Sequence, residues 1–134
     1  MAAAVEAEWK FLIKIKLGGI GIVSSFERFI GAKVLVTGHT GFKGTWLTLW
    51  LKQLGANVSG VSIDIPSEPS HFKAAKLSEK IDDHRLDIRD GDALKNLVLK
   101  VQPDFVFHLA AQALVRTSYE NPVETWQTNV LGTL

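Results

Sequence analysis

Apolar residues along the chain fall into two patterns, short continuous runs and longer stretches at helical spacing. Continuous runs bounded by turn-forming residues are typical of buried parallel strands, whereas helical spacing is typical of amphipathic helices. The runs predict strands at residues 34–37, 57–63, 85–88 and 105–109, and the spacing predicts helices over 42–54, 90–101 and 122–134, with a shorter one near 72–77. This alternation predicts an α/β fold: the N-terminal part, about four strands, of a Rossmann-type doubly wound parallel sheet.

The same pattern makes specific predictions about packing. Trp46 and Trp50 belong to the apolar stripe of the first helix and are expected in the core. Asp90 is expected to cap the second long helix. The last helix is expected to start with Asn121 as its cap and Glu124 as a capping-box acid, to turn its apolar residues inward, and to continue to the last residue.

Composition narrows the class of protein. A chain of 134 residues with 46% hydrophobic and 22% charged residues is one globular domain at most. Its formal net charge of +1 gives no drive toward nucleic acid or an anionic membrane. The absence of cysteine excludes disulfides and thiolate metal sites and fits a cytoplasmic location. The four histidines show no metal-ligand spacing, so no metal site is expected.

Residues 1–25 differ from the rest of the chain. Their apolar stretch is interrupted by lysines and glycines, which makes it too short and too charged for a membrane span and a poor signal peptide. We expect a poorly ordered extension there, with a membrane-surface segment as the alternative. Residues 26–134 are expected to form a partial nucleotide-binding domain.

A glycine-rich loop joins the first strand to the first helix, which is how a nucleotide-binding half-domain begins. Gly38 would permit the tight turn, Gly41 would let the backbone approach a pyrophosphate at the positive end of the helix dipole, and Gly44 would let the helix pack closely. The order Lys43-Gly44-Thr45 excludes a Walker-type loop, and the T-G-x-x-G-x-x-G spacing differs from the strict Rossmann motif. The alternative is a turn without a ligand.

Asp64 is the second indication of a dinucleotide site. It lies 20 residues past Gly44, where an acidic residue at the end of the second strand accepts hydrogen bonds from the adenosine ribose. A carboxylate there would repel a 2′-phosphate, so NAD is favoured over NADP. The alternative is that Asp64 only starts the turn before Pro66.

Two later strand ends fit the same site. Asp87 and Ile88 are placed to bracket the adenine, although a turn-forming aspartate is the alternative. Small residues at 109–111 would leave room for the nicotinamide ribose, although small residues in a packed core explain them equally well.

Five stretches together carry a resemblance to a known family. They are V-T-G-H-T-G-F-K-G-T-W-L (36–47), P-S-E-P-S (66–70), F-H-L-A-A-Q (107–112), L-V-R-T-S-Y (114–119) and T-N-V-L-G-T (128–133). The glycine spacing resembles the extended short-chain dehydrogenases/reductases. Within that superfamily, residues 31–134 resemble the N-terminal part of the nucleotide-sugar 4,6-dehydratases, those acting on CDP-glucose above all.

The resemblance implies a reaction, a cofactor and site residues. In the family, NAD takes a hydride from sugar C4 while a tyrosine, made more acidic by a lysine, takes the hydroxyl proton. Water is then lost across C5 and C6, and the hydride returns to C6. The residues implied to bind NAD are Gly38, Thr40, Gly41, Phe42, Lys43, Gly44, Asp64, Asp87, Ile88, Leu109, Ala110, Ala111 and Gln112. Arg116 and Ser118 are implied to face the nucleotide sugar, with CDP-glucose favoured, and Asn129 to tie down the backbone near the active site. The full-length enzyme is expected to be a homo-oligomer.

The sequence departs from the family at the catalytic residues. It contains no Tyr-x-x-x-Lys motif, because its one tyrosine, Tyr119, has Val123 four residues on. We therefore expect an N-terminal fragment without catalytic residues, inactive alone and prone to aggregate. A fragment of another NAD-dependent sugar-nucleotide epimerase or dehydratase, and a non-catalytic NAD-binding module, are the alternatives.

Overall fold

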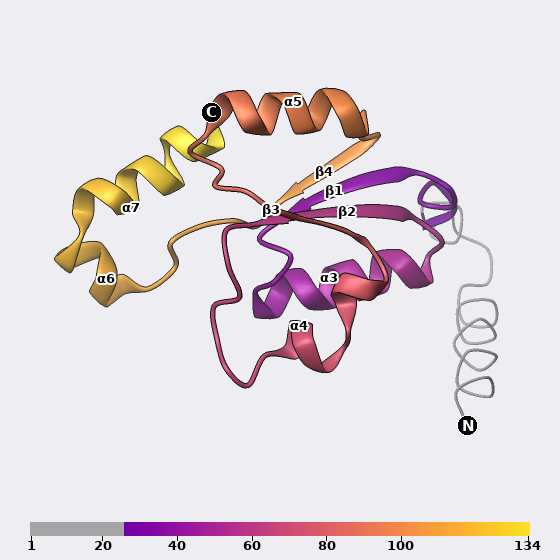
Figure 1. The fold of residues 1–134 in the computed structure, drawn as a ribbon, viewed down its shortest axis with the longest axis horizontal. Helices are drawn as coiled ribbons and strands as arrows, with labels where there is room; N and C mark the ends of the chain where they lie inside the picture. The colour runs from indigo at the N-terminus through magenta and orange to yellow at the C-terminus, as the bar shows by residue number, and fades with distance from the viewer. Residues whose placement is uncertain (1–25) are drawn as a thin grey trace, which may run out of the picture.

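The computed structural model describes residues 26–134, and the extension expected at residues 1–25 lies outside the described residues. Figure 1 shows a sheet with helices on both faces. The elements, in chain order, are β1 (Lys33–Thr37), α3 (Phe42–Gln53), β2 (Asn57–Ser62), α4 (His71–Ala74), the 3-10 turn η1 (Leu77–Glu79), β3 (Asp82–Arg85), α5 (Gly91–Val101), β4 (Phe105–His108), α6 (Val115–Glu120), α7 (Pro122–Asn129) and the 3-10 turn η2 (Leu131–Thr133).

The four strands form one parallel sheet in the order β3-β2-β1-β4. The chain runs outward from β1 through β2 to β3, and then crosses to the other side of β1 to form β4. The direction of winding therefore reverses between β1 and β4, and such a switch point leaves a crevice at the carboxyl ends of the strands. The predicted fold class is confirmed.

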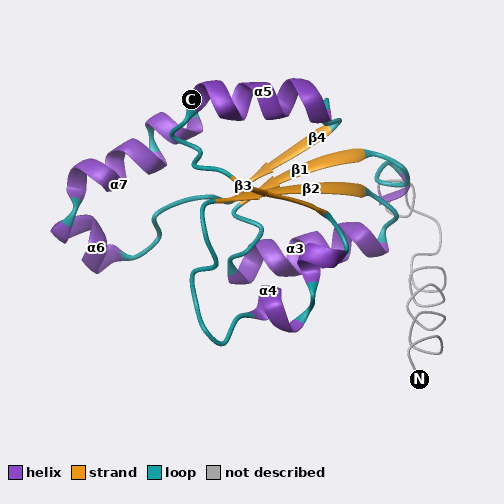
Figure 2. Ribbon diagram, in the orientation of Figure 1, coloured by secondary structure: helices purple, strands orange, loops and turns teal. Residues whose placement is uncertain are grey.

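Helices cover the two faces of the sheet, α3 and α4 on one side and α5 on the other (Figure 2). Strand residues alternate between the faces, because successive side chains of a strand point in opposite directions. Val34 and Val36 of β1 pack with Leu51 of α3 on one side, and Leu35 packs with Leu97 of α5 on the other. Each layer has its own small apolar core.

The prediction for the tryptophans of α3 is wrong. Trp46 is 56% and Trp50 48% exposed, and the helix instead buries three smaller residues and one leucine, which are Gly44, Thr45, Thr48 and Leu51. The cause is the close approach at the start of the helix, where a Cβ on Gly44 would overlap the carbonyl oxygen of Gly38. A helix face that passes so near the β1 turn has no room for indole rings.

The boundaries of β3 and α5 refine two further predictions. β3 starts at Asp82 and ends at Arg85, so the predicted strand at 85–88 begins where the real one ends. Asp87 and Ile88 therefore lie in the loop after the strand. The predicted cap of α5 is confirmed, because Oδ1 of Asp90 accepts a hydrogen bond from the Ala93 amide at 3.0 Å.

The C-terminal helices depart most from the predictions. α6 was not expected at all, and α7 ends at Asn129 instead of continuing to the last residue. Asn121 occupies the cap position, but its side chain makes no capping bond and no capping box forms. Val123 and Trp126 are exposed instead of inward. No helix within residues 26–134 is long and apolar enough to cross a membrane.

Candidate functional site

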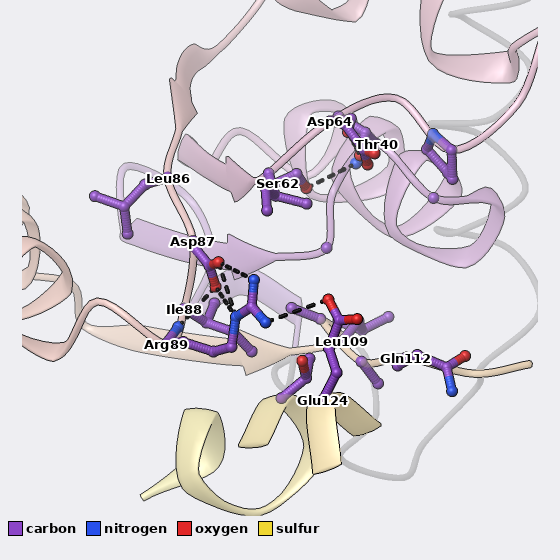
Figure 3. A pocket seen from close by; sticks show the side chains of 17 residues that line it. Thr40, Ser62, Asp64, Leu86, Asp87, Ile88, Arg89, Leu109, Gln112 and Glu124 are labelled. Atoms are coloured by element: carbon purple, nitrogen blue, oxygen red, sulfur yellow. Dashed lines mark hydrogen bonds and ion pairs between the residues drawn. The ribbon is translucent and has the colours of Figure 1, made fainter. Parts of the chain in front are cut away.

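A cleft of about 310 Å³ opens at the carboxyl ends of β1, β2 and β4, at the switch point of the sheet. Figure 3 shows its side chains converging from the strand ends and from α7. The residues that line it are Gly38, Thr40, Gly41, Ser62, Ile63, Asp64, Pro66, Leu86, Asp87, Ile88, Arg89, Leu109, Ala110, Ala111, Gln112, Glu124 and Thr128. In open α/β sheets this is the place where ligands bind.

The three glycines of the loop differ in what surrounds them. Gly38 has a φ of +72°, and a Cβ there would lie 2.7 Å from the backbone nitrogen of Ala110, so the turn admits only glycine. A Cβ on Gly44 would overlap the carbonyl oxygen of Gly38. Gly41 lines the cleft as Gly38 does, but the nearest heavy atom to an added Cβ there would be 3.4 Å away. Two glycines thus shape the turn, and the third leaves open space beside it.

The start of α3 faces this open space. Gly41 is the N-cap of α3, and no side chain caps the helix. The first amides of a helix lack partners within it and carry the positive end of the helix dipole. Phe42, Lys43 and Gly44, which occupy this first turn, are not among the residues that line the cleft.

Asp64 stands in the cleft at the end of β2. The Thr40 hydroxyl donates to the Asp64 carbonyl oxygen at 2.7 Å, which links the glycine-rich loop to the loop after β2. Arg85 Nη1 donates to the same carbonyl oxygen at 3.4 Å. Among residues 26–134, none bonds the Asp64 carboxylate, so that group is free to accept hydrogen bonds from a ligand.

Asp87 is held by an arginine that the sequence did not single out. Arg89 donates from Nη2 to Asp87 Oδ2 at 2.6 Å and from Nε to both carboxylate oxygens, at 3.0 and 2.8 Å. These hydrogen bonds hold the pKa of Asp87 below its usual value of 3.8. Arg89 Nη1 also reaches Glu124 of α7 at 3.3 Å, so Glu124 forms an ion pair across the cleft (Figure 3). No sequence pattern pairs residues so far apart.

The side of the cleft beyond β4 is fixed by hydrogen bonds to the backbone. Thr37 Oγ1 accepts bonds from the amides of Leu109 and Ala110, both at 3.1 Å, at the point where β4 ends. Asn129 of α7 brackets Gln112: its Oδ1 accepts from the Gln112 amide at 2.8 Å, and its Nδ2 donates to the Gln112 carbonyl at 2.9 Å. The polar residue in the apolar pattern of α7 thus holds the loop at 109–112.

Arg116 and Ser118 lie on α6 and do not line the cleft. Arg116 pairs with Glu120 one turn on at 2.8 Å, and Ser118 donates to the Val115 carbonyl at 2.6 Å. Both side chains are thus occupied within their own helix. In the described part of the chain, no three His, Cys, Asp or Glu side chains are grouped as a metal site would require.

The structure brings most of the residues implied to bind NAD into one cleft. Only Phe42, Lys43 and Gly44 are not among those that line it. The sequence interpretation missed the lining residues Ser62, Ile63, Pro66, Leu86, Arg89, Glu124 and Thr128. Ser62, Ile63 and Leu86 could have been found, because they directly precede predicted site residues at strand ends. Glu124 and Thr128 could not, because only the tertiary fold brings α7 to the cleft.

Comparisons with known proteins agree on one family. The family model of GDP-mannose 4,6 dehydratase matches residues 35–134. The CDP-glucose 4,6-dehydratase of Salmonella typhimurium is 52% identical over 104 residues, covering 78% of this chain and 29% of that protein. The UDP-glucose 4-epimerase of Mycolicibacterium smegmatis is 34% identical, covering 76% of this chain and 32% of that protein.

Solved structures share the fold. An epimerase from Methanothermobacter thermautotrophicus superposes with a TM-score of 0.70 at 35% identity, over 81% of this chain and 31% of that chain. The UDP-glucose 4-epimerase of Thermus thermophilus, solved in complex with NAD, gives 0.66 at 30% identity, over 75% of this chain and 30% of that chain. The chain thus spans about three-tenths of the length of these relatives.

Proposed function

The chain belongs to the GDP-mannose 4,6-dehydratase family of NAD-dependent sugar-nucleotide dehydratases and epimerases, and from that membership we propose that it is the cofactor-binding portion of a CDP-glucose 4,6-dehydratase. One observation carries the proposal: an open glycine at a helix start, and a carboxylate that no residue of 26–134 bonds, line the same cleft at the switch point of the sheet. The first suits a pyrophosphate and the second suits a ribose.

The residues of the cleft divide by the part of NAD that each would hold. The loop of Gly38, Thr40, Gly41, Phe42, Lys43 and Gly44 would hold the pyrophosphate, chiefly through backbone amides. Asp64 would bind the adenosine ribose, and Asp87 with Ile88 the adenine. The residues Leu109, Ala110, Ala111 and Gln112 would lie along the nicotinamide half. When bound, NAD supplies a reversible hydride acceptor.

The open space beside Gly41 is what makes these residues fit a dinucleotide. A Cβ at Gly41 would take up room that the pyrophosphate needs. At the other two loop glycines, backbone atoms already occupy the space that a Cβ would need. Asp64 supports NAD over NADP, because its carboxylate would repel a 2′-phosphate. Arg85, which reaches the Asp64 carbonyl oxygen, and Arg89, which lines the cleft, are each paired with an aspartate.

CDP-glucose is the proposed sugar nucleotide of the complete enzyme. The support is the 52% identity to a CDP-glucose 4,6-dehydratase, against 34% to a UDP-glucose 4-epimerase. The sequence has no Tyr-x-x-x-Lys, so this chain lacks the group that would take the C4 hydroxyl proton. We expect no turnover of CDP-glucose by the chain alone, and measurable formation of the 4-keto sugar would contradict this.

Calorimetric titration with NAD and NADP tests the cofactor assignment. The chain should bind NAD saturably and NADP at least about tenfold more weakly, a difference of about 1.4 kcal/mol. Asp64→Arg should reverse or erase that preference. Glu79→Arg makes the same change of charge outside the cleft and should leave it intact. Equal affinity of the wild-type chain for both dinucleotides would contradict the role of Asp64.

A further inference from the structure

We propose that His39 is a positioning residue for the glycine-rich loop: its buried side chain fixes the Thr40 amide and so presets the loop for a pyrophosphate. The inference rests on the proposed function of the cleft as a dinucleotide site. His39 does not line the cleft. Its contacts with three separate elements carry the argument.

The imidazole of His39 is fully buried between the loop, β2 and β3. Its Nε2 lies 2.8 Å from Oδ1 of Asp83 on β3, and its Nδ1 lies 3.1 Å from the hydroxyl of Ser62 on β2. Phe72 packs edge-on against the ring, with 5.4 Å between the ring centroids. A Cβ at Gly60 would lie 2.8 Å from Nδ1, so a side chain on that strand residue would displace the ring.

The partners of the ring fix where its proton sits. A carboxylate accepts hydrogen bonds, so Nε2 carries the hydrogen and donates it to Asp83. Nδ1 then accepts from the Ser62 hydroxyl. The Ser62 oxygen in turn accepts from the Thr40 amide at 3.4 Å, the bond drawn in Figure 3. The bonds thus run in one direction, from the loop amide through Ser62 and His39 to Asp83.

The surroundings keep this imidazole neutral. Burial is the largest influence and lowers the pKa of His39 below its usual value of 6.5. The hydrogen bond and charge of Asp83 and a backbone hydrogen bond to Val61 act in the opposite sense, whereas Arg85, which pairs with Asp83 at 2.9 Å, reinforces the lowering. A neutral ring leaves Nδ1 able to accept from Ser62, which a protonated ring cannot do.

Two threonine hydroxyls also hold the glycine-rich loop. Thr45 Oγ1 donates to the His39 carbonyl at 3.1 Å, and Thr40 Oγ1 donates to the Asp64 carbonyl at 2.7 Å. His39 thus anchors the glycine-rich loop to the interior beside the sheet, while Thr40 ties it to the loop after β2, which carries Asp64. A loop ordered before binding spares a phosphate-bearing ligand the entropy cost of ordering it.

The test uses ADP and adenosine as probes, because only ADP needs the phosphate loop. Ser62→Ala removes the hydroxyl between His39 and Thr40, and Ser59→Ala makes the same change on the same strand at a buried serine away from the cleft. We expect Ser62→Ala to weaken ADP binding at least about tenfold with little change for adenosine, and Ser59→Ala to change neither. His39→Asn, whose Oδ1 can accept from Ser62, should keep ADP binding near the wild-type level, whereas His39→Leu should lose it.

Hydrogen exchange of the Thr40 amide gives a readout that does not depend on any ligand. The amide should exchange about tenfold faster in Ser62→Ala than in the wild-type chain and Ser59→Ala, with circular dichroism confirming that all three are folded. Equal ADP affinity and equal Thr40 exchange in Ser62→Ala and wild type would overturn the role of His39. No ADP binding by the folded wild-type chain would instead overturn the proposed function of the cleft.

Discussion

The two sides of the cleft are built by different means. The β1–β3 side, made of β1, α3, β2 and β3 with their following loops, is held by buried packing and buried polar bonds. Leu35, Leu51, His39 and Thr45 are all fully buried there. The β4–α7 side, made of β4, α6, α7 and η2, has only Gly132 buried within these elements, and the exposed Asn129 side chain holds its loop through hydrogen bonds to the Gln112 backbone.

Exposed apolar side chains occur on both sides, as Trp46 and Trp50 of α3 show, but residues 105–134 carry more of them. Tyr119 is 83% and Trp126 65% exposed, and Val106 of the edge strand β4 is also exposed. Buried packing fixes a conformation without a ligand, whereas a surface of exposed apolar groups is fixed only when something covers it. For the proposed NAD site, we therefore expect the β1–β3 side to preset the adenosine half and the nicotinamide half to be less firmly fixed.

The largest expected effect comes from adding a methyl group at the tightest contact of the β1–β3 side. Gly44→Ala should cost about 3 kcal/mol or more of unfolding free energy, because its Cβ overlaps backbone that cannot move aside. Gly91→Ala, at a helix start with nothing within 4 Å, is the matched control and should be nearly neutral. Urea denaturation measures both, and similar midpoints for the two variants would contradict the account.

A pair of core and surface truncations compares the two sides directly. Leu51→Ala should cost about 2–5 kcal/mol, because Leu51 is 1% exposed and its loss leaves a cavity. Trp126→Ala should cost less than about 0.5 kcal/mol in spite of the larger side chain, because its ring is mostly in water. A larger loss for Trp126→Ala would mean that the β4–α7 side is packed as tightly as the other.

Gly41→Ala separates binding from stability within the same loop. The nearest heavy atom to the added methyl is 3.4 Å away, so the fold should tolerate it within about 1 kcal/mol. NAD affinity should fall at least about tenfold, because the methyl occupies the space beside the helix start. Calorimetry and a denaturation curve on the same sample measure the two effects. Unchanged affinity would remove Gly41 from the site.

The stability of the β1–β3 side should depend on pH through His39. The pKa of this group is lowered in the folded state, so the unfolded chain binds more protons at acid pH. Its contribution is complete above pH 6.5 and is lost as the pH falls from 6.5 through the lowered folded-state value. Denaturation curves should therefore show a steeper fall in this window for the wild type than for His39→Asn. Equal slopes would mean that His39 titrates as it does in the unfolded chain.

The smallest expected effect is on the ion pair across the cleft. Glu124→Gln removes one end of its 3.3 Å contact with Arg89, and both side chains are well exposed to solvent. Exposed ion pairs contribute little to stability, so no measurable change in unfolding midpoint is expected. A clear destabilisation would show that this contact joins the two sides more firmly than its exposure suggests.

The sequence predicted the β1–β3 side better than the β4–α7 side, and the cause is local. The turn at Gly38, the loop after β2 at Asp64 and the Asp90 cap depend on neighbouring residues, so a short window contains their signal. The third strand, predicted at 85–88, lies at Asp82–Arg85. The face that α3 buries was predicted wrongly, because hydrophobicity favours Trp46 over Thr45, while the contact between Gly44 and the turn decides otherwise.

The remaining errors concern contacts between distant parts of the chain. The sequence around Glu124 predicts a capping-box acid, but its carboxylate accepts a hydrogen bond from Arg89, 35 residues earlier. The burial of His39 depends on Asp83 and on the bare backbone at Gly60, neither of which is near it in sequence. Only the fold brings such groups together.

Titration of the chain with the two halves of the proposed cofactor tests the central claim most directly. Calorimetry with ADP, nicotinamide mononucleotide and NAD compares a ligand of the β1–β3 side, a ligand of the β4–α7 side and the whole. The account predicts that ADP and NAD bind with dissociation constants within about threefold of each other, a difference below about 0.7 kcal/mol, and that the mononucleotide does not bind measurably. Saturable binding of the mononucleotide, or NAD binding far more tightly than ADP, would contradict it.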